Sequence, residues 1–339
     1  MAITPHRKVV TEPRALHESQ TEAKPNSGPA AGSRGIFAGL EWRLVFLLVA
    51  MVAVTLLFGS LNGYYLSWAH FLDMGRQASL LVVVALGANL IIVAGEIDLS
   101  IGAIVGLVSV AVPLFFDLTL PMPIVLLLAL VIGAIVGAAN GVITLRLMVP
   151  SFLTTLGTMA IARGLALYIS DQPRQVSDDT FAAAFNGSIA GIPEVVLYSF
   201  GLTALVAFFW KYSRFGLQIR AIGSSQQGAR FAGVPTHHLK FMVFVLAGIF
   251  SAAGALLLLG RTLTGLAGAA DGLELNAIAA VILGGGRLGG GKGSMVGTFL
   301  GAILLTMVFS GIAGMGLTAA WQLLTKGMIL VVVIIFMRK

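Results

Sequence analysis

The sequence lacks cysteine and contains few charged residues. None of its 339 residues is Cys, and Asp, Glu, Lys and Arg together make up only 10%. Without cysteine there can be no disulfide, iron–sulfur cluster or thiol nucleophile, and the five histidines do not have the spacing of metal ligands. Soluble domains carry about a quarter charged residues. The 58% hydrophobic content therefore predicts a membrane protein without redox or zinc chemistry.

The first 41 residues contain no apolar run of the kind that makes a signal peptide. They are polar, carry charges of both signs and include several prolines, which is typical of disordered segments. We therefore expect a disordered cytoplasmic tail at 1–41, followed by a transmembrane domain over 42–339.

The rest of the chain contains ten apolar segments that approach the roughly 20 residues a helix needs to cross a bilayer. Two are irregular, because the third follows the second almost without a loop and the eighth is only about half a span long. The sequence thus predicts an all-α, polytopic integral membrane protein with about ten transmembrane helices, including broken or re-entrant segments. The segments are 42–61, 78–96, 100–116, 122–145, 151–170, 194–212, 239–260, 274–286, 295–313 and 320–337.

The distribution of charge predicts the orientation of these spans. With the amino terminus inside, sixteen of the 21 basic residues lie on the cytoplasmic side, as the positive-inside rule requires, and ten spans place both termini there. The net charge of +7 therefore indicates topology in lipid and not binding of nucleic acid. Acidic residues, Asp271 among them, fall outside. Arg163 and Lys326 lie within predicted helices near the outer boundary, and we expect their side chains to extend to the interface.

A glycine-rich stretch at 282–297, "ILGGGRLGGGKGSMVG", raises the question of nucleotide binding. Gly286, Gly291 and Lys292 fit the start of the motif G-x-x-x-x-G-K-[ST], but Gly293 stands where a hydroxyl must hold Mg²⁺. The stretch lies between two apolar segments, with no predicted strand before it. We interpret it as a tight cytoplasmic turn whose glycines let neighbouring helices approach closely.

Two acidic residues in "GEIDLSIGAIVGL" (95–107) separate two apolar segments. Asp98 or Ser100 could simply cap the next helix, with Glu96 at the interface, or these residues could orient a broken helix beside a translocation path. The sequence leaves both interpretations open. A paired-carboxylate hydrolase is disfavoured, because no base, nucleophile or metal ligand accompanies the two acids.

Several uncharged polar residues also lie inside predicted spans. Most such groups bond to a neighbouring helix or to a backbone carbonyl, but a minority could face a polar path. Together with the residues of the interrupted segment, the candidates for lining a translocation path are Asp98, Ser100, Asn89, Asn140, Thr154, Thr155 and Asn276.

The loop 211–240 carries five basic residues and no acidic one. It could lie on anionic headgroups as a positively charged anchor. Its centre, "SSQQGARFAGV", predicts a short helix that is capped by Ser224 or Ser225 and ended by Gly233 and Pro235. Because this helix is polar and lacks an apolar face, docking to a cytoplasmic partner is the better interpretation.

Three stretches resemble the inner-membrane permease subunits of bacterial ABC importers for monosaccharides, of the ribose/xylose/arabinose type. "GEIDLSIGAIVG" is similar to the signature G-G-I-D-L-S-[VI]-G-S, "RFGLQIRAIGSSQQGARFAGV" to a cytoplasmic coupling segment, and "LELNAIAAVILGGGRLGGGKGSMVGT" to a glycine-rich carboxyl-terminal signature. The resemblance extends from about residue 45 to the end of the chain. It has two departures, since Glu96 replaces the second glycine of the first signature and the tail before Arg43 is longer than usual.

The resemblance implies a multi-pass protein of the bacterial inner membrane, paired as a homodimer or as a heterodimer with a similar permease. It also implies a periplasmic sugar-binding protein and a separate cytoplasmic ATP-binding subunit, so we expect no cofactor, metal or catalytic residue in this chain. A coupling helix would insert into that ATPase and transmit its closure. The residues implied in this role are Gly223, Ser224, Gln227, Ala229, Arg230, Ala232, Gly233 and Val234.

We therefore expect a permease that translocates a monosaccharide and is powered by ATP on another subunit. The alternative is an ion- or proton-coupled secondary transporter of a small polar solute, for which Asp98 is the only good coupling residue. An intramembrane enzyme is the least favoured class, because the chain has no H-E-x-x-H motif and no histidine deep in a predicted span.

Overall fold

The structure, a computed structural model, describes residues 36–316 without a gap, Met1, and a few positions after 316. These later positions are 318, 320, 321, 323–325, 327, 328 and 331. The predicted tail before residue 36, Lys326 and most of the predicted tenth segment lie outside the described residues. The described part is helical almost throughout, as the apolar segments predict.

Seven helices of the described part are long and apolar enough to cross a membrane, and each overlaps a predicted span. Serine residues begin two of them, since Ser67 accepts the backbone N–H of His70 and Ser294 accepts that of Gly297. The seven are α1 (Ile36–Leu61), α2 (Trp68–Val93), α4 (Met122–Arg146), α5 (Ser151–Ile169), α7 (Glu194–Tyr212), α10 (Thr236–Thr262) and α12 (Met295–Gly314).

Two shorter apolar helices occupy the segments that were predicted to be irregular. They are α3 (Ile101–Asp117) and α11 (Leu273–Leu283), with 17 and 11 residues. At 1.5 Å per residue α11 covers roughly 16 Å, about half of the hydrocarbon core of a bilayer. The chain is also non-helical between the end of α2 and the start of α3. The prediction of broken helices is confirmed at both places.

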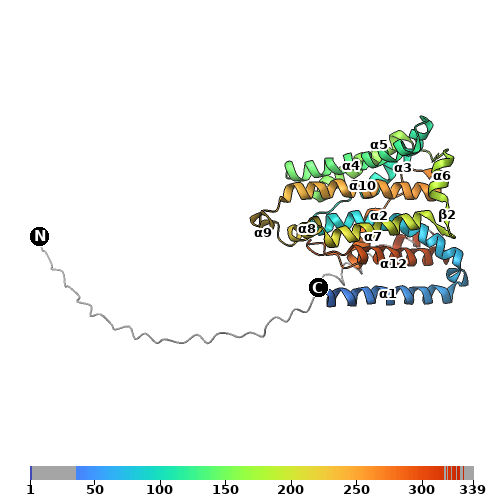
Figure 1. The fold of residues 1–339 in the computed structure, drawn as a ribbon, viewed down its shortest axis with the longest axis horizontal. Coiled ribbons are helices and arrows are strands. Elements are labelled where there is room, and N and C mark those ends of the chain that lie inside the picture. The colour runs from blue at the N-terminus through green and yellow to red at the C-terminus, as the bar shows by residue number, and fades with distance from the viewer. Residues whose placement is uncertain are drawn as a thin grey trace.

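Short elements close the two ends of the helix bundle (Figure 1). One end carries η1 (Gly63–Leu66), α6 (Asp179–Asn186) and two antiparallel strand pairs, β1 (Arg174–Gln175) with β4 (Thr264–Gly265) and β2 (Ser188–Ile189) with β3 (Ile192–Pro193). The opposite end carries α8 (Arg214–Ser224) and α9 (Gln226–Phe231), on the left in Figure 1. We call it the basic end, because Arg146, Arg287, Lys292 and the basic loop 211–240 lie there.

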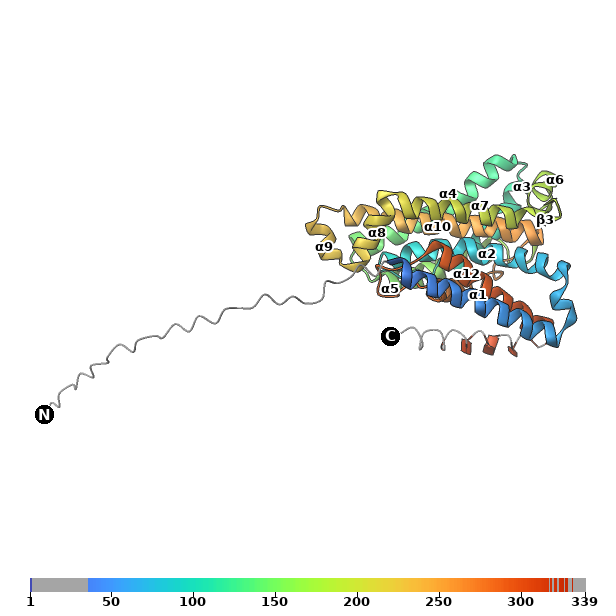
Figure 2. The ribbon, with the colours of Figure 1, turned by 60° about the horizontal axis from the view of Figure 1, so that its bottom comes forward.

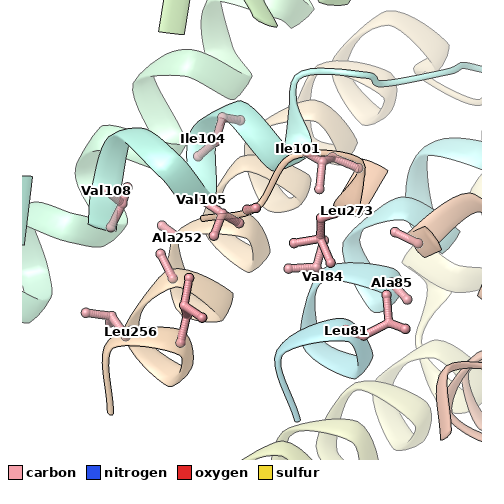
Figure 3. Close-up of a cluster of buried hydrophobic side chains, with 14 of the residues drawn as sticks. Leu81, Val84, Ala85, Ile101, Ile104, Val105, Val108, Ala252, Leu256 and Leu273 are labelled. Carbon is pink, nitrogen blue, oxygen red and sulfur yellow. The ribbon is translucent and has the colours of Figure 1, made fainter. Parts of the chain in front are cut away.

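α2 and α10 run through the middle of the bundle, and most of their residues are buried, whereas most residues of α1, α4, α5 and α7 are exposed or only partly buried. α1 and α12 lie side by side in both overall views (Figures 1 and 2). The largest group of buried apolar side chains joins α2, α3, α10 and α11. In the close-up, Val84 of α2, Val105 of α3 and Leu273 of α11 point into this shared core (Figure 3).

Glycines bring the backbones of α4 and α10 into contact. A Cβ atom at Gly137 would overlap the carbonyl oxygen of Phe244, and one at Gly133 would overlap that of Gly248. Close backbone approach of this kind lets helices pack by van der Waals contact in lipid, where the hydrophobic effect does not drive them together. The interpretation of the abundant glycine as a helix-packing device is therefore confirmed for this helix pair.

Candidate functional site

The interruption between α2 and α3 is held by a buried polar network. Asp98 Oδ1 accepts hydrogen bonds from the Ser100 backbone N–H at 2.8 Å and from the Ser100 hydroxyl at 2.6 Å. The Ser100 hydroxyl in turn accepts one from Asn140 Nδ2 of α4 at 2.9 Å. All three residues are at most 2% exposed. Ser100 occupies the N-cap position of α3 but makes no side-chain cap bond, so its hydroxyl serves Asp98 instead.

Hydroxyl groups of α5 satisfy the unwound backbone on either side of Asp98. The N–H of Ile97 donates to Ser151 Oγ at 3.2 Å, and the N–H of Leu99 donates to Thr155 Oγ1 at 3.1 Å. This matters because backbone groups in a membrane must find partners within the protein or in a water-filled cavity. We call residues 94–100 the α2–α3 break. Asp98 therefore organises the start of α3 within a broken helix, and the position of this break beside a translocation path stays a prediction.

The structure brings Asp98, Ser100, Asn140 and Thr155 together and leaves other candidates apart. Three buried oxygens beside this network, Asp98 Oδ2, Asn140 Oδ1 and Thr154 Oγ1, have no hydrogen-bond partner among the described residues. Two predicted path residues lie elsewhere.

Asn89 is fully buried and faces α12, where its Nδ2 donates to Thr298 Oγ1 at 3.0 Å. Asn276 lies in α11 and is half-buried. The partner of Asn89 was not predictable from the sequence. Residues 78–93 of α2 are apolar on all sides, so their periodicity does not show which face is interior.

A second irregular segment, residues 266–272, lies beside α3. Between β4 and α11 the chain is largely non-helical, and the Ser109 hydroxyl donates to the Leu266 carbonyl at 3.0 Å. A Cβ atom at Gly106 would overlap the carbonyl oxygen of Ala267, and one at Gly102 would overlap Glu274 Oε2. The missing side chains on this face of α3 therefore make room for the segment. Its residues Gly268 and Ala269 are exposed.

Two carboxylates lie beside Arg163 of α5, one from Asp271 of this segment and one from Glu274 at the start of α11. Arg163 Nη2 lies 3.1 Å from Asp271 Oδ1 and 3.6 Å from Glu274 Oε1. The side chains of Arg163, Asp271 and Glu274 are 33%, 63% and 10% exposed. Arg163 Nε and Glu274 Oε2 are buried and have no hydrogen-bond partner in the part of the chain that the structure describes. We call these three residues the charge cluster.

The charge cluster shows where the side chain of Arg163 lies. It turns to the two carboxylates, while its reach to the interface and the position of Asp271 outside stay predictions. Arg163 is twelve residues into α5, roughly 18 Å from its start at the basic end. The sequence contains a signal for this arrangement, because Asp271 and Glu274 are three residues apart where the half-length apolar segment begins. Charges inside a membrane pair with one another and face a bundle interior or a water-filled cavity.

The basic loop forms two short helices. Ser213 caps α8 by accepting the Gly216 N–H, and Ser225 caps α9 by accepting the Gly228 N–H at 3.0 Å. α9 ends before Gly233, whose φ of 77° belongs to the left-handed region. The predicted short helix, its serine cap and its end are confirmed. Phe231, at its tip, is 84% exposed.

α8 is fixed to the end of α7. Arg220 Nη1 donates to the Trp210 carbonyl at 3.2 Å, and the guanidinium lies over the Trp210 ring at 5.3 Å from its centroid. Burial lowers the pKa of Arg220 from its ordinary value, although a guanidinium stays charged. α8 therefore gives α9 a rigid base.

The residues implied in coupling divide into an outward and an inward set. Ala229 is buried, and Gly223 and Val234 are half-buried. A Cβ atom at Gly223 would overlap the Val93 carbonyl oxygen, so this glycine serves packing within the bundle. The residues that face outward are Ser224, Gln227, Arg230, Ala232 and Gly233.

The glycine-rich stretch is a turn between α11 and α12 and follows no strand. Gly290 and Gly291 have φ angles of 84° and 78°, and the Gly291 N–H donates to the Val93 carbonyl at 2.9 Å. This places the turn against the ends of α2 and α8. The helix–turn–helix context differs from the strand–loop–helix context of a phosphate-binding loop, as the sequence predicts.

Comparison with known proteins identifies the family. Residues 70–334 match the family described as the branched-chain amino acid transport system / permease component. The chain belongs to this permease family. It is 33% identical over 290 residues to the probable ABC transporter permease protein YphD of Escherichia coli, covering 85% of this chain and 87% of the relative.

Two further relatives carry sugar names. The galactose/methyl galactoside import permease protein MglC of Escherichia coli is 32% identical, with 79% of this chain and 85% of the relative covered. The ribose import permease protein RbsC of Haemophilus influenzae is 28% identical, with 87% and 92% covered. No solved structure matches the chain. The protein is thus a multi-pass inner-membrane permease subunit of the sugar ABC importer family and not an enzyme.

Replacing Arg163 tests the depth of the charge cluster. We expect Arg163→Gln to lower the free energy of unfolding of the permease by about 3 kcal/mol, because Glu274 is left without a counter-charge in a low-dielectric place. Arg163→Gln combined with Glu274→Gln recovers part of the loss. The measurement is thermal or denaturant unfolding of the purified permease in lipid nanodiscs.

Arg76→Gln is the matched control. Arg76 pairs with Asp73 at 2.8 Å and its side chain is 30% exposed, close to the value for Arg163, but both residues precede the apolar segment predicted at 78–96. A loss of no more than about 1 kcal/mol is expected there. Equal losses for the two variants would show that the charge cluster is an ordinary surface ion pair.

Proposed function

We propose that this permease imports a neutral monosaccharide, driven by ATP hydrolysis on a separate cytoplasmic subunit that grips α9. A second permease copy, or a similar permease, completes the assembly, and a periplasmic binding protein delivers the sugar. The observation that carries this proposal is α9 itself, a capped short helix that projects from the basic end with most of its surface exposed.

α9 has the chemistry of a docking element. Phe231 and Gln227 are exposed, whereas Ala229 of the same helix is buried and packs against the rest of the protein. A rigid helix with an aromatic anchor at its tip loses little conformational entropy on binding. The positive charge of the loop supports a cytoplasmic location, where such a partner would be an ATPase.

The face formed by α3, α5 and the segment before α11 supports the position of the path. It carries the half-exposed charge cluster and exposed non-helical backbone at Gly268 and Ala269. Neither feature is stable against lipid hydrocarbon. This face therefore lines a water-filled path and meets the second permease across it.

The polar groups on the side formed by α3, α5 and the segment before α11 favour an uncharged sugar as the substrate. The partly exposed charge cluster supplies donors and acceptors for sugar hydroxyls, and the buried hydroxyl and amide groups of Ser100, Thr155 and Asn140 hold the adjoining break in place. The proteins named for ribose and galactose import are similar over most of their length. The family description also mentions branched-chain amino acids, so an amino acid must be included in the test.

Ion-coupled transport is the second candidate, and one observation favours it. Asp98 is 2% exposed and its Oδ2 atom has no partner, so it could exchange a proton or hold a cation. Dependence of uptake on ATP separates the two mechanisms.

Disrupting the tip of α9 tests ATPase docking. We expect Phe231→Asp to reduce copurification of the ATP-binding subunit at least tenfold without lowering the melting temperature of the permease, because the side chain makes few contacts within the chain. Met148→Asp is the control, since Met148 is 87% exposed at the basic end but lies outside α9. Undiminished copurification with Phe231→Asp would contradict docking through α9.

Uptake in cells tests the substrate class. The permease is expressed with its binding protein and ATP-binding subunit in a bacterium that lacks its own ribose and galactose importers. We expect uptake of labelled D-ribose or D-galactose that is lost on depletion of ATP and persists when the proton gradient is dissipated. Uptake of labelled leucine instead, or uptake that follows the proton gradient, would contradict the proposal.

A further inference from the structure

Lys240 is a buried cation in α10 with two partners from distant parts of the chain. The residue is 5% exposed, and its ammonium lies 2.6 Å from Glu96 Oε1 and 2.9 Å from Gln226 Oε1. The side chain of Glu96 is only 15% exposed. Charge-assisted hydrogen bonds in such surroundings are short and strong, and separating the charges leaves each of them buried without a partner. We call this group the Glu96–Lys240–Gln226 link.

The link and a second contact fix α9 to α10 at both ends. Gln226 is the first residue of α9 and bonds to Lys240. Near the other end, Arg230 Nε donates to Thr236 Oγ1 at 3.0 Å and its Nη2 lies 2.8 Å from His237 Nε2. α10 is one uninterrupted helix of 27 residues. A displacement of α9 therefore moves α10 as a rigid body.

The same ammonium reaches the α2–α3 break. Glu96 belongs to the break, whose flanking backbone groups at Ile97 and Leu99 are bound by hydroxyls of α5. α5 also carries Arg163 of the charge cluster. One continuous set of polar contacts thus runs from the docking helix through Lys240 to the break and on to α5.

We propose that Lys240 is a positioning residue that couples α9 to the α2–α3 break through its simultaneous bonds to Gln226 and Glu96. The inference rests on the proposed function, because it needs an ATPase that moves α9. It also extends that function, since docking through α9 alone would move α10 and leave the break free. Glu96 stands where the resembled signature has glycine, so this chain supplies the link with a side chain that the signature lacks.

The absence of cysteine makes the break directly measurable. A single cysteine at Ile97 reports its exposure through the rate of labelling by a water-soluble maleimide, in the permease–ATPase complex with and without ATP and vanadate. When the cysteine at Ile97 is the only substitution, we expect ATP with vanadate to change the labelling rate at least fivefold. Glu96→Gln and Lys240→Met should each reduce the change to less than twofold, while the ATPase still copurifies.

Exchange of the two charges separates coupling from mere stability. In Glu96→Lys with Lys240→Glu the pair is restored in reverse, and the Gln226 amide can donate to the new carboxylate, so the nucleotide response should return to within about twofold of the parent. Asp73→Asn, which breaks the exposed Asp73–Arg76 pair at the far end, is the control and keeps the full response. A full response in the single variants, or no recovery in the exchanged variant, would overturn the proposal.

A second measurement is independent of the ATPase. Spin labels at Phe231 and Phe152, which are 84% and 47% exposed, report the distance between α9 and the start of α5 in the isolated permease. We expect Glu96→Gln to broaden this distance distribution and the exchanged variant to narrow it again; an unchanged distribution would contradict the link. If no ATPase binds the parent permease, the proposed function fails, and the spin-label result still decides whether the link positions α9.

Discussion

Backbone N–H and C=O groups inside a bilayer must be bonded within the protein or by enclosed water, and this constraint shapes the permease. Its two irregular segments are each held by neighbouring helices. Ser151 and Thr155 of α5 bond the α2–α3 break, and Ser109 of α3 bonds the segment that leads into α11. Where a side chain would obstruct this contact, α3 has Gly102 and Gly106. The interruptions are therefore built parts of the fold.

These interruptions bring polar side chains together inside the helix bundle. The break holds Asp98 and Ser100 against Asn140 of α4, and Asp271 and Glu274 lie beside Arg163. The central helices α2 and α10 are largely buried among apolar neighbours. The proposed path for a polar solute runs along the side formed by α3, α5 and the segment before α11, where Gly268, Ala269 and Asp271 are exposed.

Local sequence patterns determined the elements but not their long-range partners. Apolar runs and their lengths predicted the spans and the half-length α11, and serine and glycine signals predicted α9. They could not predict that Arg163 meets Asp271, because the depth to which a re-entrant segment descends depends on the glycines of another helix. The contact of Lys240 with Glu96 was hidden for the same reason. The bond of Asn89 to Thr298 was likewise not predictable, because a helix buried on all sides has no polar face to orient it.

The central claim is that the side formed by α3, α5 and the segment before α11 faces water within the membrane. The direct measurement is labelling of single cysteines, introduced into this cysteine-free chain in intact membranes, by a membrane-impermeant thiol reagent. The account predicts that cysteine at Ala269 reacts, whereas cysteine at Gly201, on the exposed face of α7, does not. Equal protection of both positions would place Ala269 against lipid or in a closed contact and would contradict the account.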